Sequence, residues 1–254
     1  MLEVRDVTVR AGSRALLEGV SFAAEAGEIV GVIGPNGAGK TTLLEALVGL
    51  RRTGSAVVTF RGERLSSFHD RARTFAFLPD AAELAFELDV RALVTHALRF
   101  RPRPAELVDE LRDALRIADL LEAPAGVLSR GERQRVALFC ALAVDRPVVV
   151  LDEPFNAFDP LQLREVLGAV RRVSEAGAAV VATVHQLRDA QKIATLIVEA
   201  AGVPILDWSM PPYSGFPFVA EGVRRTVLVV LAYLVMPLGL LTTGALFTRR
   251  RSVR

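Results

Sequence analysis

The chain has 254 residues, 51% of them hydrophobic, so it is long enough for one large α/β domain, alone or with a smaller appendage. Its net charge of +2 is uneven: residues 224–254 hold six arginines and no acid, which leaves the first 223 residues at −4. This body lacks the basic surface of a nucleic-acid-binding protein, and we expect no nucleic-acid partner. The single cysteine, Cys140, excludes disulfides within the chain, and its apolar surroundings favour a buried, unreactive thiol.

Strands are predicted at the start of the chain. Residues 2–9 and 55–60 alternate like strands, and together with residues 20–33 they predict an antiparallel sheet. Within this stretch, the apolar run 28–33 predicts a buried parallel strand. The N-terminus also lacks the basic, apolar and small-residue order of a secretory signal, so we expect the catalytic body in the cytosol.

Residues 34–42, GPNGAGKTT, fit the Walker A pattern through Gly34, Gly39, Lys40 and Thr41. Glycines let the backbone turn its N–H groups inward, and the N-terminus of a following helix adds partial positive charge, so the stretch predicts a phosphate cradle. Lys40 would reach the β- and γ-phosphates, and Thr41 would place its hydroxyl on Mg²⁺. The predicted nucleotide-binding residues are Gly34, Pro35, Asn36, Gly37, Ala38, Gly39, Lys40, Thr41 and Thr42.

Helices and strands then alternate, which is typical of a parallel sheet with crossover helices. A short strand at 75–78 precedes a helical insertion whose two helices are separated by the sequence RPRP at 101–104. Asp89 as N-cap and Pro104 as first helical residue predict these helices over 89–100 and 104–118. A helix beginning near Ser129, a strand at 148–154, a helix at 160–175 and a strand at 178–185 follow.

At this point the chain resembles the ATP-binding cassette (ABC) ATPase family, over about residues 2–207. LSRGERQR from 128 resembles the family's LSGGQ signature, and VVVLDE ending at Glu153 resembles its Walker B motif. AFDP at 157–160 resembles the D-loop, and TVH at 183–185 resembles the switch histidine. A Walker A alone would fit a GTPase or a kinase, whereas a signature 23 residues before Asp152 is specific for this family.

The resemblance implies a role for each matching residue. Asp152 would hold Mg²⁺ through water, Glu153 would polarise the attacking water, and His185 would contact the γ-phosphate. Ser129 and Gly131 would bind the phosphates of ATP held by the opposite subunit. The family therefore implies ATP and Mg²⁺ as cofactors, a homo- or heterodimer of ABC ATPase domains as the working unit, and a transmembrane permease as partner.

The chain departs from the family pattern at four positions in three motifs. Ala11 replaces the aromatic residue that stacks on adenine, and Asp80 replaces the Q-loop glutamine. The Asp80 carboxylate can face Mg²⁺ as an oxygen ligand. Arg130 and Glu132 replace a glycine and a glutamine of the signature, so we expect a usable but altered signature.

The C-terminal part follows a different pattern. Residues 193–206 resemble the family's final hairpin, and residues 208–225 are interpreted as a linker. Residues 226–248 are 23 uncharged positions, enough for a transmembrane helix. Pro237 and Gly239 could instead divide them into a membrane-associated hairpin, which would keep both arginine clusters at the cytoplasmic surface.

The fold prediction is therefore an α/β P-loop NTPase cassette over residues 1–207. It has a mostly parallel core sheet, an antiparallel β subdomain, a helical subdomain at about 80–145 and a hydrophobic C-terminal helix. The function prediction is the ATPase subunit of an ABC transporter, located at the cytoplasmic face of the membrane and energising a permease. The alternative is a nucleotide-gated regulatory or assembly module with weak ATPase activity, as Ala11, Asp80 and Arg130 could allow.

Overall fold

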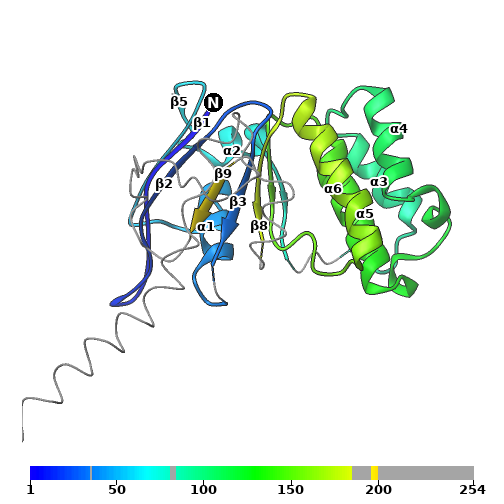
Figure 1. Cartoon of the computed structure of the whole chain (residues 1–254), viewed down its shortest axis with the longest axis horizontal. Helices are drawn as coiled ribbons and strands as arrows, with labels where there is room; N and C mark the ends of the chain where they lie inside the picture. Colours follow the sequence, from blue (N-terminus) through cyan, green and yellow to red (C-terminus); the bar gives the residue numbers. More distant parts are fainter. Residues whose placement is uncertain (35, 81–83, 185–195, 200–254) are drawn as a thin grey trace, which may run out of the picture. The chain divides into compact units, whose positions relative to one another are not determined.

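Two β-sheets and a group of helices form the described part of the chain (Figure 1). The computed structural model describes residues 1–34, 36–80, 84–184 and 196–199, all within one compact unit, Met1–Leu206. The strands are β1 (Leu2–Ala11), β2 (Arg14–Ala24), β3 (Ile29–Ile33), β4 (Ser55–Phe60), β5 (Glu63–Arg64), β6 (Phe75–Leu78), β7 (Val148–Leu151), β8 (Ala179–Thr183) and β9 (Leu196–Glu199). The helices are α1 (Lys40–Val48), α2 (Phe68–Thr74), α3 (Val90–Leu98), α4 (Ala105–Ala114), α5 (Arg130–Ala143) and α6 (Pro160–Glu175), with short 3₁₀ turns at Ala118–Leu120 and Ala125–Val127.

The central sheet is parallel, with strand order β6-β7-β8-β3-β9. Its inner strands β7 and β8 are buried along their whole length, as expected of apolar runs covered on both faces. In register, Val32 of β3 lies opposite Thr183 of β8, and Leu151 of β7 lies opposite Ala182. The carboxyl ends of these three strands are therefore level, which positions the site described below.

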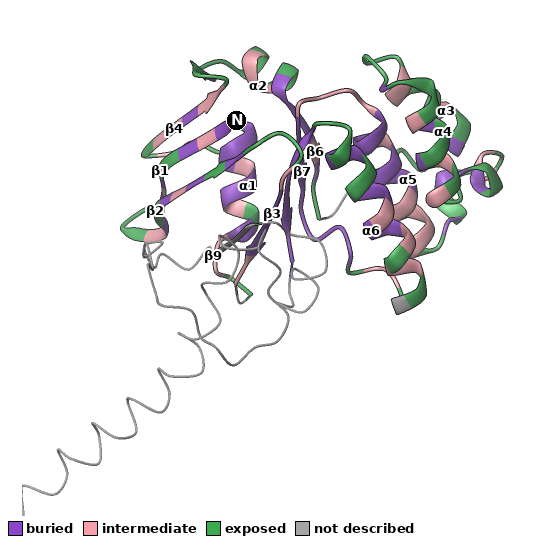
Figure 2. Ribbon diagram, turned by 45° about the horizontal axis from the view of Figure 1, so that its top comes forward, coloured by how far each residue is buried: buried purple, intermediate pink, exposed green. Residues whose placement is uncertain are grey.

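Successive side chains of the central sheet enter two different cores. Figure 2 shows the buried residues along the central sheet and in the helices beside it. Val149 and Leu151 pack into the core formed with α3, α4, α5 and α6. Val148 and Val150 pack into a second core, which contains α1 and the antiparallel sheet β2-β1-β4-β5. Figure 1 shows α1 between the two sheets and the α5 and α6 helices on the opposite face of the parallel sheet.

The predicted antiparallel segment 20–33 is wrong in extent. Residues 20–24 do end β2, but the chain then turns through Gly27, whose φ of +82° is accessible mainly to glycine. Ile29–Ile33 forms β3 in the parallel sheet instead. The earlier interpretation of 28–33 as a buried parallel strand is therefore the correct one.

Helix boundaries follow the capping residues that the sequence contains. Asp89 Oδ1 accepts a hydrogen bond from Ala92 N and begins α3, and Asp159 Oδ1 caps α6, whose first residue is Pro160. The range predicted for α6, 160–175, is confirmed. The range predicted for α4 is too long, because the helix ends at Ala114 and Arg116 has a φ of +52°.

Only part of the predicted C-terminal region lies within the described residues. β9 pairs in parallel with β3, while the second strand of the predicted final hairpin, the linker 208–225 and the segment 226–248 lie outside them. Among the helices of the described residues, none is long and apolar enough to cross a membrane.

Candidate functional site

The segment between β3 and α1 forms a cradle at the carboxyl end of the parallel sheet. Gly39 has a φ of +91°, and a Cβ there would lie 2.9 Å from both Leu16 O and Leu17 Cδ2, so only glycine fits. Leu43 N donates to Gly39 O at 2.8 Å, which starts the hydrogen-bond ladder of α1. The first turn of α1, residues 40–42, lines a cavity at this point, and the N-terminus of a helix favours an anion.

Two carboxylates follow β7 at the same edge of the sheet. Asp152 is completely buried, and Glu153 is 8% exposed. Thr183, the last residue of β8, joins the two: its Oγ1 donates to Asp152 Oδ1 at 2.7 Å and accepts from the Glu153 backbone N–H at 2.6 Å. Asp152 Oδ2 has no hydrogen-bond partner among the residues that the structure describes.

The Glu153 carboxylate is held between the second core and the cradle. Its backbone has a φ of +50°, a strained conformation for a residue with a side chain. Asn156 Nδ2 donates to Glu153 Oε2 at 2.6 Å, and Lys40 Nζ lies 3.7 Å from Glu153 Oε1. Lys40 also donates to Gly34 O at 2.9 Å and is 6% exposed. Buried charges need compensating partners, and here the positive charge of Lys40 and the negative charge of Glu153 compensate each other.

One cavity of about 430 Å³ brings most of the predicted site residues together. Its lining residues are Leu16, Asn36, Gly37, Gly39, Lys40, Thr41, Thr42, Asp80 and Glu153. Asp80 reaches the cavity because Asp152 N donates to Leu78 O at 2.8 Å, which extends the pairing of β6 with β7. Ala11 does not line the cavity, whereas Leu16, which the sequence did not single out, does.

The predicted signature residues lie apart from this cavity, at the start of α5. Ser129 and Glu132 form a capping box: Ser129 N donates to Glu132 Oε2 at 2.8 Å, and Glu132 N donates to Ser129 Oγ at 3.3 Å. Hydrogen bonding of the Glu132 carboxylate to the Ser129 side chain, and to its backbone N–H, holds the pKa of Glu132 below its ordinary value. A Cβ on Gly131 would lie 3.4 Å from Ala157 O, so a larger residue would press against the segment before α6.

The structure therefore assembles Lys40, Thr41, Asp80, Asp152 and Glu153 but leaves Ser129 and Gly131 elsewhere. Pro35 and His185 lie outside the described residues. The sequence did not lead us to predict Thr183 and Asn156 as site residues. Thr183 belongs to the motif TVH at 183–185, and Asn156 lies between the Walker B motif and the D-loop motif. A polar residue ending an otherwise apolar buried strand is the signal that could have identified Thr183.

Comparisons with known proteins agree on one family. The family profile described as ABC transporter matches residues 17–156. The sulfate/thiosulfate import ATP-binding protein CysA of Methylococcus capsulatus is 35% identical over 182 residues, which are 68% of this chain and 52% of that protein. The hemin import ATP-binding protein HmuV of Pseudomonas entomophila is 37% identical over 199 residues, or 74% and 78% of the two chains. A solved ATP-binding subunit of an ABC transporter superposes with a TM-score of 0.71 at 27% identity, covering 80% of this chain and 88% of that one.

Replacing Lys40 with alanine should weaken nucleotide binding at least tenfold, because each charge-assisted hydrogen bond to a phosphate contributes roughly 1.5–3 kcal/mol. Titration with a fluorescent ATP analogue measures the affinity, and circular dichroism checks the fold. Arg52→Ala is the matched control, since Arg52 is an exposed cation outside the cavity. Equal affinity in the Lys40→Ala variant and the unmodified chain would contradict the phosphate cradle.

Proposed function

Because this chain belongs to the ABC transporter family, we propose that it binds and hydrolyses ATP to energise a separate membrane permease, from the cytoplasmic face of the membrane. The observation that carries the proposal is the convergence of Lys40, Glu153 and Asp80 on one cavity beside the helix N-terminus. The chain spans 52% of the CysA relative, so the activity and partners of a whole transporter subunit are part of this proposal. The names of the relatives, sulfate/thiosulfate and hemin import proteins, describe different cargoes, and we assign none to this chain.

ATP binding rests on backbone geometry and one cation. The phosphates would lie against the N–H groups of residues 36–42, including Thr42, with the Lys40 ammonium reaching the β- and γ-phosphates. Lys40 now donates to Gly34 O and faces Glu153, so its ammonium is already held at the mouth of the cradle. Ala38 is half-buried behind the loop and would contribute only its backbone.

The residues present fit Mg²⁺ as a cofactor. Asp152 Oδ2 is a buried carboxylate oxygen without a hydrogen-bond partner in the described part of the chain, and the Thr41 hydroxyl and Asp80 carboxylate line the neighbouring cavity. All three are oxygen donors, which suit a hard divalent cation. The described residues contain no cluster of three acidic, histidine or cysteine side chains. One or two carboxylates, a hydroxyl and the nucleotide phosphates form the usual Mg²⁺ shell in such sites. The cation would neutralise charge on the phosphates.

Glu153 is the group that would polarise the attacking water. Asn156 fixes one carboxylate oxygen and Lys40 attracts the other, so the carboxylate keeps one orientation toward the cavity. The adjacent Asp152 is held by its hydrogen bond from Thr183 Oγ1. Asp152 would therefore bind the metal, while Glu153 would accept the proton. His185, which the family uses at the γ-phosphate, would complete this group.

A second ATPase domain, from an identical or a different chain, would close the site. The N-terminus of α5, with its partial positive charge, is not part of the nucleotide cavity of its own chain, and Ser129 is exposed there. The Ser129 oxygen accepts the Glu132 N–H in the cap, and its hydroxyl hydrogen, which also bonds the Glu132 carboxylate, would have to turn to a phosphate oxygen when a nucleotide binds. Gly131 has no side chain, which would allow a partner's nucleotide to approach the backbone closely.

The permease would dock on an exposed apolar surface of the helical region. This apolar surface consists of Phe86, Leu88 and Val127, which are 51%, 44% and 73% exposed. Gly126 N donates to Phe86 O and Ala125 N donates to Leu88 O, so the two segments are joined. Asp80 of the nucleotide cavity stands only six residues before Phe86 in the chain, and this short connection would couple the nucleotide to the permease.

Replacing Glu153 with glutamine should lower the rate of ATP hydrolysis at least about a hundredfold, because a positioned general base contributes roughly 10²–10⁴-fold. ATP binding should persist, and ATP should then hold two domains together, as light scattering after gel filtration would measure. Glu175→Gln, an exposed change at the end of α6, is the control. Unchanged hydrolysis would refute the role of Glu153, and a variant that stays monomeric with bound ATP would refute the paired arrangement.

The substitution Asp80→Asn removes one charge while keeping the side-chain length. If Asp80 faces Mg²⁺, the Mg²⁺ concentration for half-maximal ATP hydrolysis should rise roughly tenfold, from the loss of a unit charge a few Å from a divalent cation. Asp119→Asn, at an exposed site in a 3₁₀ turn, should leave it unchanged. An identical Mg²⁺ dependence in Asp80→Asn would remove Asp80 from the metal site.

The function as a whole is tested by measuring phosphate release from the purified chain, alone and with a permease encoded beside it. We expect the permease to stimulate hydrolysis, and the double variant Phe86→Ser/Val127→Ser to lose the stimulation while keeping its basal rate. Phe68→Ser, an equally exposed aromatic on α2, is the control. ATP binding without turnover under both conditions would favour the regulatory or assembly module instead.

A further inference from the structure

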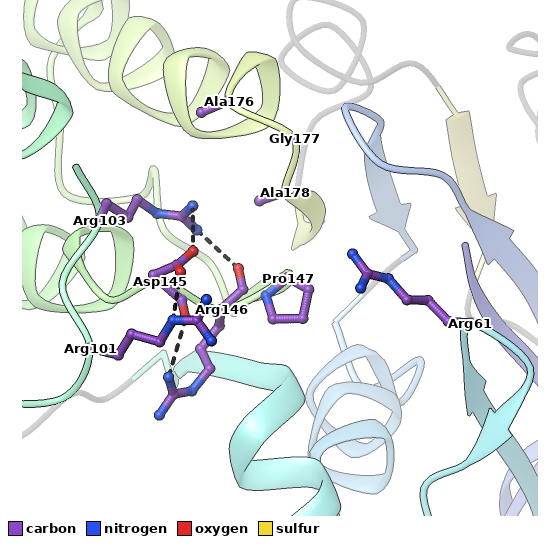
Figure 3. Close-up of a pocket in the computed structure, with 9 residues that line it drawn as sticks. All are labelled: Arg61, Arg101, Arg103, Asp145, Arg146, Pro147, Ala176, Gly177 and Ala178. Atoms are coloured by element: carbon purple, nitrogen blue, oxygen red, sulfur yellow. Dashed lines mark hydrogen bonds and ion pairs between the residues drawn. The ribbon is translucent and has the colours of Figure 1, made fainter.

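A second cavity, of about 230 Å³, lies at the opposite edge of the parallel sheet. Pro147 and Ala178 line it, and they directly precede β7 and β8, whereas the nucleotide cavity lies beyond the carboxyl ends of the same strands. Strands of four and five residues separate the two cavities by roughly 15 Å. The lining residues are Arg61, Arg101, Arg103, Asp145, Arg146, Pro147, Ala176, Gly177 and Ala178 (Figure 3).

Four arginines and one carboxylate give this arginine cavity a formal charge of +3. Asp145 pairs with Arg101 at 2.9 Å and with Arg103 at 3.7 Å, so one acid is shared between two guanidinium groups. No acidic partner of Arg61 is found within the described residues. Figure 3 shows Arg61 extending toward Pro147 from the side opposite Arg101 and Arg103. The cavity is therefore deficient in negative charge.

Arg103 is a built part of the cavity and not a mobile surface side chain. Its side chain is 4% exposed, its Nε donates to Leu142 O at 2.7 Å and its Nη2 donates to Arg146 O at 3.1 Å. Its Nη1 lies 3.7 Å from Asp145 Oδ1, beyond hydrogen-bond distance. Burial lowers the pKa of the Arg103 guanidinium from its ordinary value, and Asp145 opposes this effect only in part.

Two of the arginines are directed to the cavity by strained backbone. Arg61 has a φ of +53° and Arg101 a φ of +35°, both in the left-handed region that residues with side chains rarely adopt. Arg101 O accepts from Asp145 N at 2.8 Å, so pairing with the segment after α5 holds this conformation. For Arg61 the conformation, with a φ of +83° at Gly62 after it, is that of the two-residue turn that joins β4 to β5.

We propose that the arginine cavity is a binding site for a small phosphate-type anion, separate from the nucleotide site. Guanidinium groups bind phosphate oxygens through paired N–H donors. Here they approach from opposite sides, which suits a tetrahedral group with oxygens in several directions better than a planar carboxylate. The cavity has room for a ligand of several atoms rather than a single water.

The bound anion would connect separate parts of the fold. Arg61 stands in the turn between β4 and β5, Arg101 and Arg103 stand between α3 and α4, and Arg146 stands before β7. Contacts to Arg61, Arg101 and Arg103 would join the antiparallel sheet to the helical insertion beside the central sheet. Arg146 adds positive charge there, while its Nε donates to Ala72 O at 2.9 Å and its Nη1 to Asp145 O at 3.2 Å. The anion would therefore stabilise one relative placement of the helical insertion.

The test is calorimetric titration of the full chain with pyrophosphate, without Mg²⁺ and in the Lys40→Ala background, which removes binding at the nucleotide cradle. We expect saturable binding at one site, weakened at least tenfold by the double substitution Arg61→Gln/Arg101→Gln. Arg99→Gln removes one charge, as Arg61→Gln alone does, from an exposed position outside the cavity and should change the affinity less than twofold. Succinate should bind at least tenfold more weakly than pyrophosphate.

Three results would overturn the proposal. They are absence of saturable pyrophosphate binding, equal weakening by the control Arg99→Gln, and equal binding of succinate. Arg61→Gln alone provides the milder variant, because the Arg61 guanidinium lies over the neighbouring Phe60 ring, 5.1 Å from its centre, and forms no ion pair within the described residues. This variant should retain the unfolding temperature of the background chain and still bind pyrophosphate severalfold more weakly. Unchanged affinity for pyrophosphate in this variant would also count against the site.

Discussion

The parallel register of β3, β8 and β7 is the constraint on which the nucleotide site depends. Val32 opposite Thr183 and Leu151 opposite Ala182 bring the cradle, the threonine and the two carboxylates to one level. A slip of one residue would turn Thr183 to the other face of the sheet and break both of its hydrogen bonds. The apolar cores on the two faces fix this register, so packing determines the chemistry at the edge.

The site contains several unfavourable features at once. It holds a buried lysine and glutamate, a carboxylate oxygen without a hydrogen-bond partner among the described residues, and a glutamate with positive φ. Each costs on the order of 1–3 kcal/mol, which is a large part of the net stability of a domain. Two extensive apolar cores beside the same strands offset these costs. ATP and a divalent cation would supply the missing partners.

Local sequence patterns were sufficient for the features that depend on neighbouring residues. The cradle before α1, the caps Asp89, Ser129 and Asp159 and the buried runs of β7 and β8 are of this kind. Thr183 acts on Asp152, which the fold brings to it from the end of another strand, and the arginine cavity joins four separate loops, so neither follows from spacing alone. Asn156 bonds Glu153 only three residues away, but no motif pointed to this contact. The wrong extents of 20–33 and of α4 arose where a positive φ, at Gly27 and Arg116, ends an element whose apolar pattern continues.

Helix α5 connects the two ends of the described unit. Its 14 residues span about 21 Å. At its C-terminal end, Arg103 donates from its backbone N–H to Ala143 O and from its guanidinium to Leu142 O, which satisfies the last carbonyls with a cation. At its N-terminal end, Ser129 is exposed, where the proposed second ATPase domain would bring its nucleotide. If α5 shifts as a rigid unit between two positions, binding at its two ends is coupled. By thermodynamic reciprocity, an anion bound at one end and a nucleotide bound at the other then change each other's affinity by the same factor.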